Sequence, residues 1–408
     1  MTDTEITSFL NSKNYDIRVH HNARWIDQKC TPDVVCIVAD CIVNYLDENG
    51  MNSIFATKDI WFSNYTMQNV HDIFRKVDVD SDSAKNEYDK FFGQPMKLFA
   101  YAGILEEKKQ GRGNVYSIVN YDILKHIAIR ERNALSFLIK YIRKVITDSG
   151  LMPAFDTFFA RQTIQAYDDL KETFFNFTVM HTAIGSKGSS GRTECGRIFT
   201  KIINVLAFDL NKRGTEKGHL SKYAIKYDML MYNRDNFRDI YSEKPKSVSR
   251  KDYMAENHIE INEAYYRYMS SKAKRRLKEY NDRCREGKSE IEGDTEYASH
   301  MHHIFPAGEF PEISYYLENL IALTPTQHLN YAHPNGRTTV IDRGYQHDCL
   351  LVKTDIIEEN INNAEEVIYS FADFIHVLVV GFSEDSFNEI EESDYDGIKT
   401  KIELAYLA

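Results

Sequence analysis

Five of the fourteen histidines in this 408-residue chain lie in one short segment near the C-terminal third. An even distribution would place about one histidine in a segment of that length. Imidazole is a common metal ligand, and its pKa lies close to neutral pH. The clustering therefore predicts a site that binds a metal or transfers protons. Its members are His300, His302, His303, His328 and His333.

The residues around these histidines also predict their local structure. Tyr297–Phe305 is short, aromatic and followed by proline, which is typical of a strand that ends where proline lacks an N–H. After a loop, the apolar run Asn319–Leu323 predicts a buried strand. Thr324–Gln327 supplies Thr as N-cap, Pro at the first helical position and Gln at the third, which predicts a helix. Pro334 ends that helix after about eight residues.

This order and spacing resemble the HNH nucleases, which have the ββα-metal fold. In that family, an Asp-His or His-His pair ends the first strand, Asn opens the second, and His or Asn on the helix completes the metal site. Position by position, the resemblance implies that His303 is the general base and that His302 and His328 bind the metal. It implies that Asn319 orients His303.

The chemistry of phosphodiester hydrolysis fits these residue types. Water must lose a proton near neutral pH, which an imidazole can accept, and a divalent ion can neutralise charge on the phosphate. Adjacent strand residues point to opposite faces, so His302 and His303 are expected to divide these two tasks. The family implies Mg²⁺, although two imidazoles would also suit Zn²⁺, and Mn²⁺ is a further alternative. It also implies products with a 5′-phosphate and a 3′-hydroxyl.

Two other histidines are candidates for supporting roles. His333 follows His328 by five residues, about 140° round an α-helix, which directs it away from the same metal. His300 shares a strand face with His302 and is a candidate for contact with the metal ligands or a phosphate. A direct role at the metal is the alternative for His333, and a solvated or packed side chain is the alternative for His300.

Composition is ordinary for a soluble protein, with 43% hydrophobic and 27% charged residues. The N-terminus is polar and acidic, unlike a signal peptide, and no apolar run reaches 18 residues. The six cysteines form no CxxC pair, which disfavours a zinc ribbon and a disulfide framework. We therefore expect a cytoplasmic, reduced protein.

The net charge of −11 is unevenly distributed along the chain. From Asp355 to the C-terminus, fourteen acidic residues stand against Lys399 and Lys401. Between Lys187 and Lys226, nine basic residues stand against three acidic ones. A DNA partner requires a local basic face, and this second stretch can supply one.

The predicted fold class is α+β, with several domains. Residues 1–135 are expected to form a winged-helix-like DNA-recognition domain, and residues 136–290 a helical or mixed domain with basic, Gly-rich DNA-clamp loops. Residues 291–354 form the predicted HNH (ββα-metal) nuclease unit, and residues 355–408 a helical acidic segment. Expected helices include Pro32–Leu46, Ser81–Phe92 (ended by a glycine and a proline), Phe155–Phe175 and Arg197–Phe208.

The winged-helix prediction is based on two short strands around a basic, Gly-rich turn, residues 103–119. In such a domain, the preceding helix enters a DNA groove and the hairpin contacts phosphate. The hairpin residues expected to do so are Lys108, Lys109 and Arg112. A winged helix used only for protein contacts is the alternative.

The middle segment contains two basic, Gly-rich loops, residues 185–191 and 212–218. Their backbone amides could approach phosphates closely, and the pair resembles the DNA-clamping loops of restriction endonucleases. Solvated loops and, around residue 234, hydrogen-bonded scaffold are the alternatives. The predicted DNA contacts are Lys187, Arg192, Arg197, Lys201, Lys212, Arg213, Lys217 and Arg234.

Together these features predict a site-specific, metal-dependent DNA endonuclease, similar to HNH-type type II restriction enzymes. Its partners would be double-stranded DNA, a cognate DNA methyltransferase and a second copy of the chain, because one HNH unit cuts one strand at a time. A homing or toxin-type nuclease, cutting nonspecifically in the latter case, is one alternative. A non-catalytic winged-helix regulator with a degenerate metal site is the other.

Overall fold

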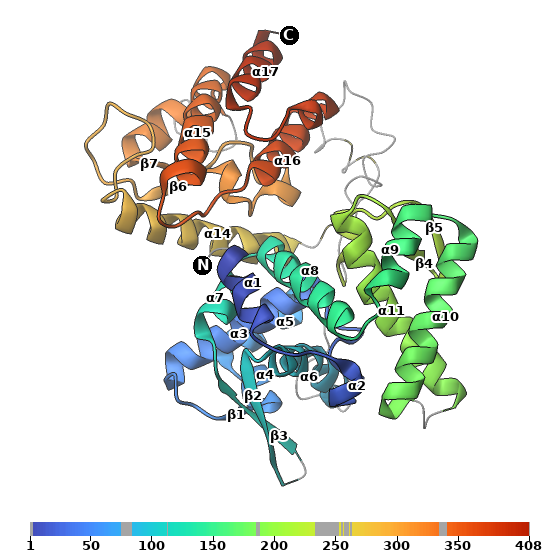
Figure 1. Ribbon diagram of the computed structural model, residues 1–408. Coiled ribbons are helices and arrows are strands. Elements are labelled where there is room, and N and C mark those ends of the chain that lie inside the picture. The colour runs from blue at the N-terminus through green and yellow to red at the C-terminus, as the bar shows by residue number, and fades with distance from the viewer. Residues whose placement is uncertain are drawn as a thin grey trace. The chain divides into compact units, whose positions relative to one another are not determined.

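The computed structural model describes residues 3–74, 84–111, 113–184, 188–232, 253, 256, 261, 263–333 and 341–407. The chain forms two compact units, residues 1–234 and residues 235–408 (Figure 1). Both are mainly helical with small antiparallel sheets, so the class is α+β, as predicted. No helix in the described part of the chain is long and apolar enough to span a bilayer.

Unit 1 contains a three-stranded sheet, a separate hairpin and most of the helices. Its strands are β1 (Phe55–Ala56), β2 (Leu105–Gln110), β3 (Gly113–Ile118), β4 (Arg213–Glu216) and β5 (His219–Ala224). Its α-helices are α1 (Asp3–Asn11), α2 (Ile17–His20), α3 (Pro32–Asn49), α4 (Thr57–Trp61), α5 (Asn64–Phe74), α6 (Ala84–Ala102), α7 (Tyr121–Ile129), α8 (Glu131–Asp148), α9 (Met152–Arg161), α10 (Ile164–His181) and α11 (Ser189–Asp209). A 3₁₀ turn, η2 (Tyr227–Leu230), follows β5.

Helix α3 forms the centre of the first part of unit 1. It begins with Pro32 at its first turn, as predicted, because proline's fixed φ suits that position. Most of its side chains are buried, and it packs against α6, α7 and α8. The three-stranded sheet has the order β1-β3-β2, with Phe55 opposite Tyr116 and Leu105 opposite Ile118. The predicted hairpin is therefore present.

Two expected helix boundaries are wrong, for opposite reasons. Helix α6 runs through Gly93 and Pro95, because the buried apolar residues on both sides of Pro95 keep the segment helical despite the missing N–H. The predicted helix Phe155–Phe175 is instead two helices, α9 and α10. Gln162 adopts a left-handed conformation (φ 53°) that ends α9, and Thr163 caps α10 by accepting from the N–H of Ala166.

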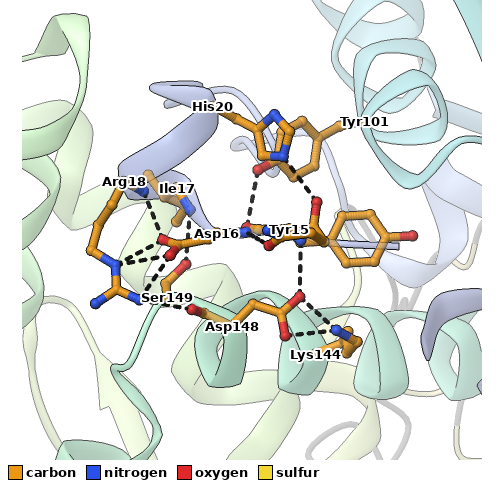
Figure 2. Close-up of polar contacts among 10 residues, drawn as sticks. Tyr15, Asp16, Ile17, Arg18, His20, Tyr101, Lys144, Asp148 and Ser149 are labelled. Atoms are coloured by element: carbon orange, nitrogen blue, oxygen red, sulfur yellow. Dashed lines mark hydrogen bonds and ion pairs between the residues drawn. The ribbon is translucent and has the colours of Figure 1, made fainter. Parts of the chain in front are cut away.

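The linker between α1 and α2 is fastened to the end of α8 by polar contacts (Figure 2). The N–H of Tyr15 donates to Oδ2 of Asp148 at 2.9 Å, and the N–H of Ile17 donates to Oγ of Ser149 at 3.1 Å. The hydroxyl of Tyr15 donates to the carbonyl of Ala102, at the end of α6. The N-terminal segment therefore links two helices that are distant in the sequence.

Replacing Asp148 with alanine should lower the free energy of unfolding by about 1–3 kcal/mol, because the N–H of Tyr15 would lose its acceptor and Lys144 its ion-pair partner. Urea unfolding measures the change. Asp156→Ala, at an exposed acid on α9, is the matched control and should change stability by less than about 0.5 kcal/mol. Equal effects in the two variants would contradict the role given to this contact.

Unit 2 places a short β-hairpin among long helices. Its α-helices are α14 (Glu263–Cys284), α15 (Arg343–Asn363), α16 (Phe371–Phe382) and α17 (Tyr395–Leu407), and its strands are β6 (His300–His303) and β7 (Leu320–Leu323). Its short helices are η3 (Pro311–Ile313), η4 (Leu317–Asn319), η5 (Gln327–Ala332) and η7 (Asp385–Glu389). The C-terminal segment is helical, as predicted. Two predicted domain boundaries fall inside helices, since residue 135 lies in α8 and residue 354 in α15.

A buried ion pair anchors the hairpin to α15. Nζ of Lys353 lies 3.1 Å from Oε1 of Glu290, and both side chains are almost wholly buried. Oε2 of Glu290 accepts from the N–H of Ala322 on β7 at 2.7 Å, and Tyr369 completes the network by contacting both charged groups. Removing either Lys353 or Glu290 would leave a buried charge unpaired, which is strongly destabilising. Because Glu290 also bonds to Ala322, the ion pair links β7 to α15.

Candidate metal centre

The histidine segment folds as strand, loop, strand and short helix, as the sequence predicts. Strands β6 and β7 are antiparallel, with His302 opposite Ile321. The predicted capping box is also present: Oγ1 of Thr324 accepts from the N–H of Gln327, and Oε1 of Gln327 accepts from the N–H of Thr324, both at 3.1 Å. The cap fixes where the helix begins and therefore where His328 lies.

Three imidazoles meet where this helix faces β6. One potential ligand atom from each of His302, His328 and His333 lies within 4.8 Å of the others. The ring centroids are 4.8–5.2 Å apart, and every pair of rings is nearly perpendicular. Three edge-on imidazoles around one point can serve as three ligands of a metal, leaving a fourth position for water or substrate.

The prediction that His333 points away from the metal is wrong, because the helix is not an α-helix. Gln327–Ala332 is a π-helix, whose hydrogen bonds join residues five apart. That wider turn brings residues i and i+5 to nearly the same side. His328 and His333 are five residues apart and therefore face the same point, where an α-helix would separate them by about 140°.

His300 occupies a different place. Its ring stacks on that of His328, with centroids 4.7 Å apart and an interplanar angle of 25°, and it is not one of the three converging residues. Its Nδ1 lies 3.1 Å from Oγ of Ser299. The ring therefore packs against His328, and the supporting role expected for His300 stays a prediction.

The donor atoms fit a transition metal better than Mg²⁺. Burial lowers the pKa of His302 to about 2 and that of His328 to about 4, with smaller effects from neighbouring histidines, so both are neutral and can donate a lone pair. Nδ1 of His328 is buried and has no hydrogen-bond partner among the described residues. Imidazole nitrogens suit Zn²⁺, whereas Mg²⁺ prefers oxygen ligands.

His303 is not one of the three converging residues, and its hydrogen-bond partners lie on other elements. Its Nε2 lies 2.9 Å from the carbonyl oxygen of Ser314 and 3.0 Å from Oγ of Ser270 on α14. Because a carbonyl can only accept, the proton is assigned to Nε2, and Nδ1 is free to accept another. Burial, followed by the charge of Lys274, lowers the pKa of His303 to about 3, so the ring is neutral near pH 7.

Asn319 acts on the loop rather than on His303, which corrects the prediction. Its side chain is fully buried and bonds both backbone groups of Phe305: Oδ1 accepts from the N–H at 2.8 Å, and Nδ2 donates to the carbonyl at 3.1 Å. Nδ2 also donates to the carbonyl of Ile313. Asn319 therefore closes the loop that carries Ser314, and it positions His303 only through that carbonyl.

Comparison with known proteins identifies no relative of this chain. Family models, curated proteins and solved structures all fail to match this chain.

The predicted DNA contacts differ in their surroundings. Four remain exposed on strands, turns or helix ends: Lys108, Lys109, Lys212 and Lys217. Arg197 on α11 is exposed as well, whereas Arg192 pairs with Glu172. Three more, Arg112, Lys187 and Arg234, lie outside the described residues.

Two other predicted contacts are engaged inside the protein. Arg213 donates from its guanidinium to the carbonyl of Gln162, and its own N–H donates to that side chain at 2.8 Å. Lys201 is partly buried beside Asp33, and burial is the main effect, lowering its pKa. The guanidinium of Arg213 is therefore engaged inside the protein, and the ammonium of Lys201 is partly shielded from solvent. The loop predicted at residues 212–218 is in fact the β4–β5 hairpin, with Lys217 in its turn.

Two residues near the metal centre, Ser270 and Lys274, were not among the predicted site residues, although the basic segment 271–283 predicts either a phosphate-contacting linker or a solvated face. Both lie on α14, which packs against β6 and β7. Only the three-dimensional contact connects them with the histidines, because they precede the hairpin by some 30 residues and carry no motif of their own.

The neutral histidines predict that acid destabilises the metal-free protein. Because the pKa values of His302, His303 and His328 are lowered in the folded state, the unfolded chain binds more protons between about pH 4 and 6.5. The free energy of unfolding should decrease as the pH is lowered through that window, by about 1.4 kcal/mol per pH unit for each histidine. Urea unfolding in chelator measures it. His302→Gln should reduce the dependence, and an unchanged dependence would contradict the prediction.

Proposed function

We propose that this chain is a metal-dependent DNA endonuclease of the HNH class, acting as a site-specific restriction enzyme. One observation carries the proposal: three imidazoles, two of them buried, converge at a capped hairpin-and-helix unit, with His303 next to His302 on the same strand. A purely structural cluster of three histidines would not require a fourth neutral imidazole next to it, that of His303, with a ring nitrogen able to accept a proton.

His302, His328 and His333 would hold the metal, and Zn²⁺ suits these ligands best. When bound, the ion would supply Lewis-acid stabilisation of the negative charge on the phosphate. The Ser314 carbonyl fixes the ring of His303 through Nε2, which leaves Nδ1 to accept a proton from the attacking water. Attack at phosphorus breaks the bond to the 3′ oxygen, giving the expected 5′-phosphate and 3′-hydroxyl ends.

Unit 1 would bind the DNA. Its chain order of helix α3, strand β1, helices α4 to α6 and hairpin β2–β3, with β1 paired to the second hairpin strand, supports the proposal of a winged-helix-like domain. We propose that α6 enters a DNA groove and that Lys108 and Lys109 on β2 approach phosphate. Lys108 also lies 2.9 Å from Glu106, so this hairpin carries charges of both signs.

A second DNA contact would be made by Arg197 and Lys217. Arg197 lines a hollow between α10, α11 and the β4–β5 turn, together with Lys171 and Arg192. Arg197→Ala with Lys217→Ala should weaken DNA binding and reduce the slope of log affinity against log salt by about 2, one per lost phosphate contact. Fluorescence anisotropy over a salt series measures the slope, with Arg213→Ala as the control for an internally bonded arginine. An unchanged slope in the double variant would remove this surface from the proposal.

Because the chain has one HNH unit, we propose that two copies act together on a duplex and that a DNA methyltransferase protects the host's own sites. Incubation of the metal-loaded protein with phage DNA tests the function. Discrete fragments are the expected result. A continuous smear would indicate a nonspecific nuclease, and intact DNA with every divalent ion tried would contradict nuclease activity.

A further inference from the structure

Lys274 lies on the face of α14 that meets the metal centre. It follows Ser270 by one helical turn, so the two side chains share a face, and Oγ of Ser270 is 3.0 Å from Nε2 of His303. Because α14 packs against both β6 and β7, the helix face that carries Ser270 and Lys274 lies toward the hairpin that carries the histidines.

Among the described residues, Lys274 has no counter-ion, whereas Arg276 and Lys278 on the same helix each have one. Arg276 pairs with Glu366 and Lys278 pairs with Asp282, whereas no described residue forms an ion pair or hydrogen bond with Nζ of Lys274. The side chain is nevertheless partly buried, and burial lowers its pKa. An unpaired, partly desolvated cation is costly, and a metal beside it would raise the cost further. Both costs fall when an anion enters the site.

We propose that Lys274 binds a non-bridging oxygen of the scissile phosphate, an inference that rests on the proposed nuclease function. An ammonium on a flexible chain is a common phosphate ligand. Negative charge on the phosphoryl oxygens must be stabilised as water attacks and the bond to the 3′ oxygen breaks. Lys274 would supply a fixed positive charge on the α14 side of the site, opposite the helix that carries His328 and His333.

Three variants test this role: Lys274→Met, Lys274→Arg and Lys278→Met. Lys274→Met should slow DNA cleavage by about 100-fold, because one preorganised charge is lost from the transition state. Lys274→Arg should keep most of the rate, because it keeps the charge. Lys278→Met removes a lysine whose charge is already paired on the same helix, and it should cleave within about threefold of wild type.

A second measurement does not depend on cleavage. In a His303→Ala background, Lys274→Met should reduce the salt slope of DNA binding by about 1, and Lys278→Met should leave it unchanged. Three outcomes would overturn the inference and leave the nuclease proposal standing. These are cleavage by Lys274→Met at the wild-type rate, an equal loss of cleavage rate in Lys278→Met, and a cleavage rate in Lys274→Arg as low as that in Lys274→Met. If wild-type protein leaves DNA intact, the nuclease proposal fails, and an unchanged slope then removes the phosphate contact as well.

Discussion

His303→Ala is expected to lower the rate of DNA cleavage by roughly 1,000-fold, because the attacking water would lose its proton acceptor. The neutral ring is held through Nε2 by the Ser314 carbonyl, and no other part of the proposed mechanism supplies an equivalent base. Single-turnover cleavage of a plasmid measures the rate. DNA affinity, measured by anisotropy, should stay within about threefold of wild type, because His303 is not a proposed DNA contact.

His347→Ala is the matched control. His347 lies on α15, is half-buried and packs against Tyr406, with ring centroids 4.9 Å apart, so its loss tests the general effect of removing a packed histidine. It should cleave at nearly the wild-type rate. If His303→Ala cleaves as fast as His347→Ala, the proton acceptor is another group and His303 has only a structural role.

His333→Ala is expected to weaken zinc binding by at least about 100-fold. Loss of a supporting contact to a metal ligand typically costs 10–100-fold in affinity, and loss of a ligand itself costs more. The variant would leave two imidazoles, His302 and His328, to hold the ion. Competition with a chromophoric chelator measures the affinity, and circular dichroism checks that the fold is retained.

His300→Ala separates the two supporting histidines that the sequence could not distinguish. Its ring stacks on His328 but supplies no converging atom, so zinc affinity should fall by less than about tenfold. The opposite pattern is a large loss of zinc affinity in His300→Ala and a small one in His333→Ala. It would indicate that the ion is bound beside His300 rather than between His302, His328 and His333. It would also show that the π-helix does not define the site.

The arrangement of the hairpin and helix could be predicted because its signals are local. The Thr324–Gln327 cap and the alternation of His302 with His303 each depend on neighbouring residues in the chain, whereas Pro334, predicted to end the helix, lies outside the described residues. Propensity, capping and strand geometry act over a few residues, so they can be interpreted without the tertiary fold.

The features that were predicted wrongly depend on contacts with distant residues or on an unusual helix. His333 belongs to the site only because the helix is a π-helix, which the amino-acid sequence of this segment does not indicate. Helix α6 continues past Pro95 because its apolar side chains are buried against other elements. Asn319 contacts Phe305 rather than His303, which depends on how the intervening loop closes.

Basic residues show the same limit. A run of lysines and arginines predicts positive charge, but an internal acceptor can engage any one of them. Arg213 donates a hydrogen bond to Gln162, and Lys201 is partly buried near Asp33, whereas Arg197 in the same segment is exposed. The sequence identified the basic segment, and only the fold distinguishes the side chains that are available to DNA.

The central claim is that three imidazoles hold one ion that the chemistry at His303 requires. The most direct measurement is cleavage of supercoiled plasmid by metal-stripped protein titrated with Zn²⁺, Mn²⁺ or Mg²⁺. We predict no cleavage in chelator and full activity at about one equivalent of zinc per chain, as expected for a three-histidine site. Equal cleavage with and without chelator, or none with any of these ions, would contradict the account.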